Sequence, residues 1–173
     1  KMSFHANLDR RPFDDGTRRI SNESIALGGK CGQDGVAFEC VTRAVSEDGE
    51  IKVLGDFICV ENADAATLVL AANTTYRYPD PEAVCLKQVD AAVSNSYDTL
   101  KGNHVADYQS LFKRVFFSIH EEEESLKALP TDERLNRVAD GNKDNGLISL
   151  YFQYGRYLLI SSSRPGCLAG NME

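Results

Sequence analysis

The hydrophobic period of the sequence changes near residue 80, and this change limits the chain to a small set of folds. Residues 2–73 carry apolar side chains at alternate positions in short runs, such as Val36, Phe38 and Cys40, a pattern typical of β-strands. After Asp80 the apolar residues recur every three or four positions, as in an α-helix. Strands followed by helices, without alternation of the two, indicate an α+β protein with antiparallel sheets.

The strand half looks incomplete. We expect about six short strands, which is few for a β-sandwich with covered edges. Asp48-Gly49 is a two-residue hairpin signal, and Gly55-Asp56 marks the next turn. The run Ala66–Thr74 is almost continuously apolar and predicts a strand buried on both faces. We therefore expect part of a sandwich, with bare edges that favour self-association.

Four helices are expected after the strands. Asp80 has the chemistry of an N-cap and is followed by proline, which suits the first helical position. The second helix starts near Ser96, and the third is capped by Thr131 and stopped by Gly141. The fourth runs from about Asn145 to Ile160, and its dense apolar and aromatic content predicts that it packs against other polypeptide.

Composition excludes several classes of function. A net charge of −7 gives no basic surplus for binding a nucleic-acid backbone, and no apolar run reaches the roughly 18 residues that span a membrane. The five cysteines are an odd number without a CxxC pair, which argues against a disulfide framework and a structural zinc site. Buried, inert thiols are expected instead.

Three groups of polar residues could carry chemistry, and each has a structural alternative. His104 and Asp107 lie one helical turn apart, as metal ligands or as an Asp that orients a His within a packed interface. His120 with Glu121–Glu124 could gather a cation or form a solvated acidic loop. Arg164, before Pro165-Gly166, could grip a sugar hydroxyl or a carboxylate, or cap the carbonyls of the preceding helix.

Three stretches are specific enough to indicate a family. They are HVADYQSLFKRV (104–115), LPTDERL (129–135) and LYFQYGRYLLISSSRPG (150–166), preceded by FHANLDRR and DAATLVLAANTTYRYPDPEA. Together these motifs, in this order, resemble glycoside hydrolase family 95, which contains α-1,2-L-fucosidases and related α-L-galactosidases. The resemblance covers nearly the whole chain.

The resemblance implies an architecture. In that family a large N-terminal β-sandwich leads through a helical linker into an (α/α)6 barrel that holds the active site. By this resemblance, residues 1–79 are the later strands of the sandwich, residues 80–143 are the linker, and residues 144–173 are the first barrel helix. The chain's partners would be the rest of the barrel and an oligosaccharide substrate, and a periplasmic or secreted location would follow.

The resemblance also places the catalytic groups. The family is an inverting one, in which an acid and a water-activating group stand about 6.5–9.5 Å apart. It implies that these groups lie in the barrel beyond Glu173, so we assign no catalytic residue, metal ligand or cofactor to this chain. Arg164 and Asn171 are the residues that the resemblance brings to the barrel mouth, and they are the candidates for substrate binding.

The end of the chain departs from the family pattern. Cys167 follows the Arg-Pro-Gly step, and Ala169-Gly170-Asn171 replaces the usual Pro-Ala-Asn. Losing that proline loosens the backbone at this point, because its fixed φ angle is gone. Other glycosidases and disaccharide phosphorylases also join a sandwich to such a barrel. Within the family that the chain resembles, an α-L-galactosidase is the alternative to an α-L-fucosidase. A stand-alone carbohydrate-binding or interaction module, with some of the seven tyrosines as stacking platforms, is the alternative from another class.

Overall fold

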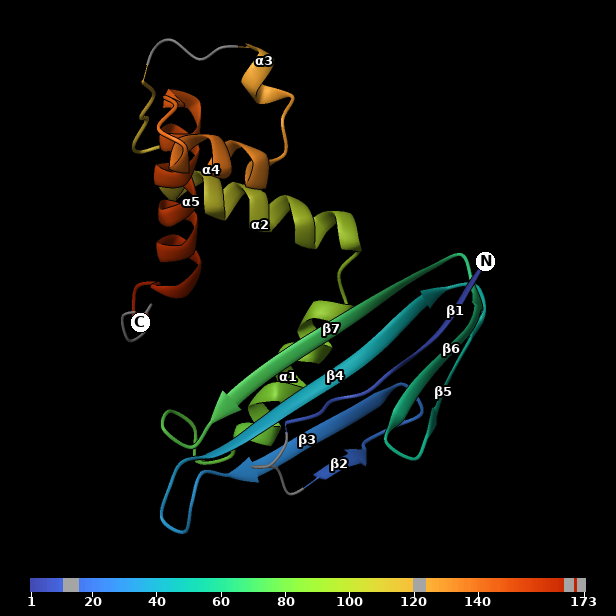
Figure 1. Cartoon of the computed structure of the whole chain (residues 1–173). Helices are drawn as coiled ribbons and strands as arrows, with labels where there is room; N and C mark the ends of the chain where they lie inside the picture. The colour runs from blue at the N-terminus through green and yellow to red at the C-terminus, as the bar shows by residue number, and fades with distance from the viewer. Residues whose placement is uncertain (11–15, 120–123, 167–169, 171–173) are drawn as a thin grey trace. The chain divides into compact units, whose positions relative to one another are not determined.

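The structure, a computed structural model, describes residues 1–10, 16–119, 124–166 and 170 of the 173-residue chain. In this part of the chain, seven strands are followed by five helices (Figure 1). The predicted α+β class, with antiparallel sheets first and helices after, is therefore confirmed. The chain divides into two compact units, residues 1–100 and residues 101–173.

The first unit is built on two antiparallel sheets. One has three strands in the order β1-β6-β5, and the other has four in the order β2-β3-β4-β7. Ile25 and Ala44 of the larger sheet share a buried core with Val53, Ile58 and Val60 of the smaller one. The strands are β1 (Met2–Ala6), β2 (Gly16–Arg19), β3 (Ser24–Lys30), β4 (Ala37–Glu47), β5 (Glu50–Leu54), β6 (Phe57–Ala63) and β7 (Ala65–Thr74).

The Asp48-Gly49 turn is present, but it does not close a hairpin. Both residues have positive φ angles, 54° and 74°, as a tight two-residue turn requires. The turn passes the chain from β4 in the larger sheet to β5 in the smaller one, so the strands on either side are not paired. The next turn, Gly55-Asp56, does close a hairpin, since Leu54 of β5 pairs with Phe57 of β6.

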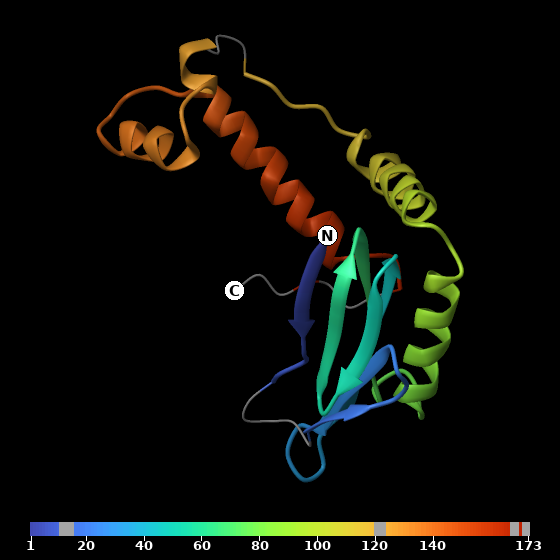
Figure 2. The same ribbon diagram turned by 90° about the vertical axis from the view of Figure 1, so that its right-hand side faces the viewer.

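The prediction that Ala66–Thr74 is buried on both faces is wrong. Strand β7 is an edge strand that pairs only with β4. Helix α1 (Pro81–Val93) covers one of its faces (Figures 1 and 2), while Leu68 and Leu70 on the other remain 45% and 57% exposed. An apolar run can mark an uncovered face as well as a buried strand, so the sequence alone did not distinguish the two.

Helix α1 begins where the sequence predicts. Asp80 is its N-cap and accepts a hydrogen bond from the amide of Ala83 at 3.0 Å, and Pro81 is the first helical residue. Its buried residues, Cys85 and Val89, join Ala26, Val41 and Ala71 of the sheet in a second core. This packing explains why the helix lies flat on β4 and β7.

The second unit consists mainly of helices. Helix α2 (Tyr97–Phe112), which reaches into it across the boundary, starts one residue after the predicted position and buries none of its side chains. It is followed by α3 (Glu124–Lys127), α4 (Thr131–Ala139) and α5 (Asn145–Ser162). Glu124 belongs to the predicted acidic loop but is the first residue of α3, and the rest of that run lies outside the described residues.

One predicted cap is wrong and one predicted stop is confirmed. Thr131 is the first residue of α4, and the N-cap position is Pro130, which has no side-chain donor or acceptor. The acidic residues Asp132 and Glu133 supply negative charge at this helix end instead. Gly141 adopts a φ of 89° two residues after the helix ends, a conformation that glycine reaches without strain.

The four described cysteines form no disulfide. Cys59 and Cys85 are buried, as predicted for inert thiols, and Cys40 is half-buried. Cys31 is exposed, so the prediction of a buried thiol is wrong at this position.

Candidate functional site

Arg164, the first predicted substrate-binding residue, pairs with an acid far away in the sequence. Its Nη2 donates a hydrogen bond to Oδ2 of Asp107 on α2, 57 residues earlier. The two side chains are 32% and 58% exposed, so the pair lies at the surface of the second unit. The alternative in which Arg164 caps the carbonyls of α5 is not what the structure shows for this nitrogen, because it binds a carboxylate.

Asp107 was also predicted to pair with His104, and here the structure gives a different arrangement. The ring of His104 stacks near Tyr108, with 6.4 Å between the ring centroids. Tyr108 in turn contacts Phe112 of its own helix and Tyr157 of α5, at centroid distances of 5.3 and 6.1 Å. His104 thus stands at one end of an aromatic contact between α2 and α5.

A second arginine secures the end of α2. The guanidinium of Arg156 donates hydrogen bonds to the carbonyls of Phe112 and Val115, at 2.6 and 2.9 Å. It also lies over the Phe112 ring, 4.5 Å from its centroid. The last carbonyls of a helix lack partners within the helix, and a cation placed there satisfies them.

Arg156 and Arg164 line a groove in the second unit. It has a volume of about 630 Å³, with apolar walls that include Leu111 and Leu159 and with Arg114, Arg156 and Arg164 at its polar positions. All three arginines are already engaged, Arg114 and Arg156 by backbone carbonyls and Arg164 by Asp107. The groove can therefore accept an acidic or hydroxylated group only at nitrogens left over from these contacts.

A buried ion pair in this unit was missed by the sequence analysis. Arg134 of α4 binds Asp144 with two hydrogen bonds, of 2.9 and 2.7 Å, and both side chains are at least 90% buried. Asp144 also accepts from the amide of Leu147 and so caps α5. The hydrogen bonds from Arg134 and this amide lower the Asp144 pKa from 3.8 to about 2, against the effect of burial.

A signal for this pair was present in the sequence. Arg134 is the fourth residue of the TDERL motif, and Asp144 directly precedes the apolar helix. An arginine inside a short amphipathic helix, followed by an N-cap Asp ten residues later, is compatible with bidentate pairing once the chain turns back. The turn at Gly141 makes that return possible.

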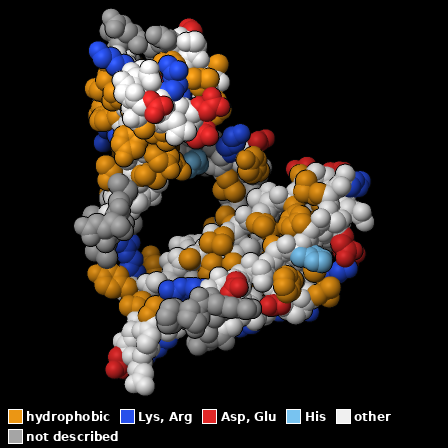
Figure 3. All heavy atoms as spheres, in the orientation of Figure 1, with side chains coloured by type: hydrophobic (Ala, Val, Ile, Leu, Met, Phe, Trp, Pro, Cys, Tyr) orange, Lys and Arg blue, Asp and Glu red, His pale blue; other side chains and the backbone are white. Residues whose placement is uncertain are grey.

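A second groove lies between α4 and α5 and is almost entirely apolar. Its volume is about 600 Å³, and its lining residues include Leu135, Val138, Leu147, Ile148, Leu150 and Tyr151. Figure 3 shows hydrophobic side chains gathered over α5. Tyr151 and Tyr154 are 77% and 55% exposed, which is unusual for tyrosines on an apolar helix face.

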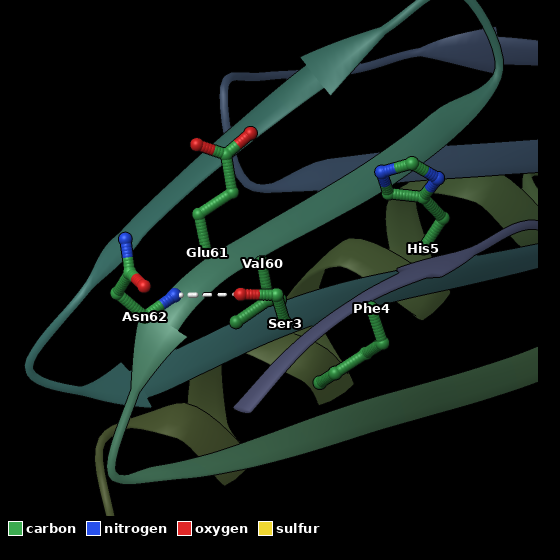
Figure 4. Close-up of a pocket in the computed structure, with 6 residues that line it drawn as sticks. All are labelled: Ser3, Phe4, His5, Val60, Glu61 and Asn62. Carbon is green, nitrogen blue, oxygen red and sulfur yellow. Dashed lines mark hydrogen bonds between the residues drawn. The ribbon is translucent and has the colours of Figure 1, made fainter. Parts of the chain in front are cut away.

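The smaller sheet carries a shallow depression between β1 and β6 (Figure 4). His5 and Glu61 project from one side of this sheet, whereas Phe4 points to the other. Asn62, in the left-handed region at a φ of 55°, donates its amide hydrogen to the Ser3 hydroxyl at 3.0 Å. Glu61 is engaged by Lys52 at 2.6 Å, so this depression brings together no free acid–base pair.

Asn171, the second predicted substrate-binding residue, lies outside the described residues, as do His120 and Glu121–Glu123. In the described ranges, no three residues of the His, Cys, Asp or Glu types are placed to hold a metal ion. No described helix is both long enough and apolar enough to cross a membrane.

Comparison with known proteins adds family information to this geometry. Residues 96–173, which contain α5 and its two grooves, match the glycosyl hydrolase family 95 catalytic domain. The chain is 39% identical to alpha-L-fucosidase 2 of Arabidopsis thaliana over 155 residues, a match that covers 80% of this chain and 18% of that protein. It is 33% identical to the probable alpha-fucosidase A of Aspergillus niger over 126 residues, covering 73% of this chain and 16% of that one.

A third relative, the probable alpha-fucosidase A of Aspergillus oryzae, is 30% identical over 133 residues, covering 67% of this chain and 18% of the relative. The chain therefore spans less than a fifth of the length of these curated relatives. The matched family and the curated relatives belong to the glycoside hydrolases. Within it, the predicted resemblance is confirmed, and the chain resembles a segment of a family 95 α-L-fucosidase.

Proposed function

We propose that this chain is the supporting part of a longer α-L-fucosidase-like glycoside hydrolase and supplies none of its catalytic groups. In this proposal, residues 1–79 belong to a sandwich domain, residues 80–143 form a linker, and residues 144–173 begin an (α/α)6 barrel. The observation that carries it is that the segment matching the catalytic domain presents an uncovered apolar groove.

The chemistry of the groove between α4 and α5 supports this role. Fully burying a Leu, Ile or Phe side chain stabilises a protein by roughly 1.5–3 kcal/mol. Leu135 of α4 and Ile148 and Leu150 of α5 are each about half exposed, at 54%, 52% and 47%. Further barrel helices packed on this surface would recover that free energy, and the helix would then be fixed as part of the barrel wall.

The ion pair and the hydrogen bonds within the second unit are suited to hold α5 in place as part of the barrel. The buried pair of Arg134 and Asp144 fixes the start of α5, and Arg156 fixes the helix against the end of α2. Active-site groups must be held to within a fraction of an ångström, so rigid supporting contacts affect the chemistry at a distance. We assign Arg164 and Asn171 to the substrate side of the barrel mouth in the longer protein.

The longer protein is expected to hydrolyse terminal α-L-fucosyl linkages with inversion at the anomeric carbon. Proton NMR during hydrolysis of 2′-fucosyllactose would detect the first-formed sugar, and β-L-fucose is the predicted product. A matched α-L-galactoside serves as the competing substrate. First-formed α-L-fucose, or a clear preference for the galactoside, would contradict the proposed activity.

A further inference from the structure

Two short motifs in the sheet unit are not used by the proposed function. Asn22-Glu23-Ser24 and Asn73-Thr74-Thr75 both have the order Asn-x-Ser/Thr with a middle residue other than proline. This order is the acceptor motif for N-linked glycosylation, and it serves as a site where the asparagine lies in a surface loop. The structure gives the two asparagines opposite surroundings.

Asn22 is exposed and lies in the short turn that joins β2 to β3 (Figure 1). The amides of Ile20 and Ser21 close this turn by donating to the carbonyl of Ser24, at 2.9 and 3.2 Å. Arg19 donates a hydrogen bond to the carboxamide oxygen of Asn22. Glycosylation modifies the carboxamide nitrogen, Nδ2, so the contact with Arg19 is compatible with an attached sugar.

The modification is a group transfer from a lipid diphosphate-linked oligosaccharide. The bond between C1 of the first sugar and the diphosphate oxygen breaks, and a bond from C1 to the asparagine Nδ2 forms. The nitrogen gives up one proton, and the lipid diphosphate leaves. A bulky, hydrophilic group is then fixed to the side chain, so the folded chain can accept it only at a position that faces solvent. Asn22 meets this condition.

Asn73 does not meet it, because its nitrogen is used inside the fold. This residue lies in β7, and its Nδ2 donates to Oε1 of Gln88 at 2.8 Å and to Sγ of Cys85 at 3.2 Å, both on α1. Cys85 is fully buried and belongs to the core between α1 and the sheet. An oligosaccharide on this nitrogen would replace both contacts and force α1 away from β7.

We propose that Asn22 is an N-glycosylation site of this chain in the secretory pathway and that Asn73 stays unmodified in the folded protein. The two motifs satisfy the same sequence rule, and the hydrogen bonds of their side-chain nitrogens distinguish them. The inference does not depend on the proposed activity, so either can fail alone.

The test locates the sugar on the chain. The 173-residue chain is secreted from a eukaryotic host behind a cleavable signal peptide, and the monomeric fraction is treated with peptide N-glycosidase in H₂¹⁸O. The enzyme converts a glycosylated asparagine to ¹⁸O-labelled aspartate, which peptide mass spectrometry identifies. We expect the label at residue 22 in most chains and none at residue 73.

Variants give an independent measurement on the intact chain. Asn22→Gln should remove the glycan mass completely. Glu23→Pro should do the same while keeping Asn22, because proline in the middle position blocks the motif. Asn7→Gln is the matched control, since Asn7 is an exposed asparagine of the same unit outside any such motif, and its glycan mass should equal that of the parent.

Two outcomes would overturn the proposal. One is a secreted parent chain without sugar at residue 22, and the other is a monomeric chain that carries sugar at residue 73. If a variant is not secreted, the site map of the parent chain decides.

Discussion

At the residue scale, the pair of Arg134 and Asp144 carries the largest predicted effect on stability. Asp144→Asn keeps the size of the side chain but leaves the buried guanidinium without its counter-charge. Breaking a buried pair by removing one partner costs about 3–5 kcal/mol. We expect unfolding of the second unit at a correspondingly lower urea concentration, and faster hydrogen exchange at the amide of Leu147. Asp140→Asn, at the exposed end of α4, is the control, and an equal effect there would contradict this account.

The same pair predicts how the free energy of unfolding depends on pH. The Asp144 pKa is lowered from 3.8 to about 2, so the folded state favours the ionised carboxylate. Its stabilising contribution is complete above pH 3.8 and is lost as the pH falls from there towards 2. Urea unfolding at a series of pH values between 5 and 2 should show this loss. The Asp144→Asn chain should lack it, and a parallel decline in both proteins would rule out the pair as its source.

Glu39 of β4 predicts the opposite dependence in the sheet unit. It is 8% exposed and accepts a hydrogen bond from Arg18 of β2 at 2.7 Å. Burial raises its pKa above the ordinary value of 4.5, so the folded state favours the protonated acid. The stability that this provides is complete below pH 4.5 and is lost as the pH rises through the folded-state pKa. Glu39→Gln should remove this decline. Thermal melts of the β-sheet signal across this range, in parent and variant, provide the measurement.

Residue-level predictions from sequence succeeded where the partner is local. Asp80 caps α1 because its partner, the amide of Ala83, is three residues away. Arg164 could be singled out, but its partner Asp107 could not, since the two lie 57 residues apart. Glu39 and Arg18 gave no sequence signal at all, because their pairing depends on strands β2, β3 and β4 lying side by side.

At the scale of elements, the cap of α1 offers a direct test of local structure. Asp80→Ala removes the side-chain acceptor for the amide of Ala83. Loss of such a cap costs about 0.5–2 kcal/mol, and Asp80→Ser should retain most of the stability because serine also caps. Chemical unfolding of the three chains gives the comparison. Equal losses in both variants would show that the charge at this position, rather than the cap, matters.

A polar substitution in the apolar groove between α4 and α5 is expected to affect the stability of this chain and of the longer protein differently. Ile148→Gln should leave the stability of this chain within about 0.5 kcal/mol, because the side chain is already half exposed. It should lower the fluorescence of a dye that binds apolar surface, and it should destabilise the longer protein. Lys143→Gln, a polar position just before α5, is the control. A large loss of stability in the short chain would mean that the groove is already covered here.

Element types were predictable where the apolar period is clear, as for α5, or where period and cap chemistry agree, as for α1. The failures share a physical cause. Strand β7 has an apolar sequence, but whether Leu68 is covered depends on what lies across from it, which no local pattern encodes. The turn at Asp48-Gly49 has the backbone of a hairpin, yet the partners of its flanking strands were settled by the packing of two sheets.

At the scale of the whole molecule, the order of strands and helices was predictable from the change of period, and the family from three motifs. The proposed domain boundaries at residues 79 and 143 stay predictions. The structure itself separates at residue 100, within α2, because this helix buries none of its side chains.

The central claim is that this chain supports a glycosidase without catalysing its reaction. The most direct measurement is the rate of fucose release from 2′-fucosyllactose by the purified 173-residue chain, beside an equimolar amount of the proposed longer protein. We predict hydrolysis by the longer protein and a rate for the chain that equals the buffer blank. Fucose release by the chain at a rate comparable to that of the longer protein, abolished by substituting one of its own acids, would contradict the account.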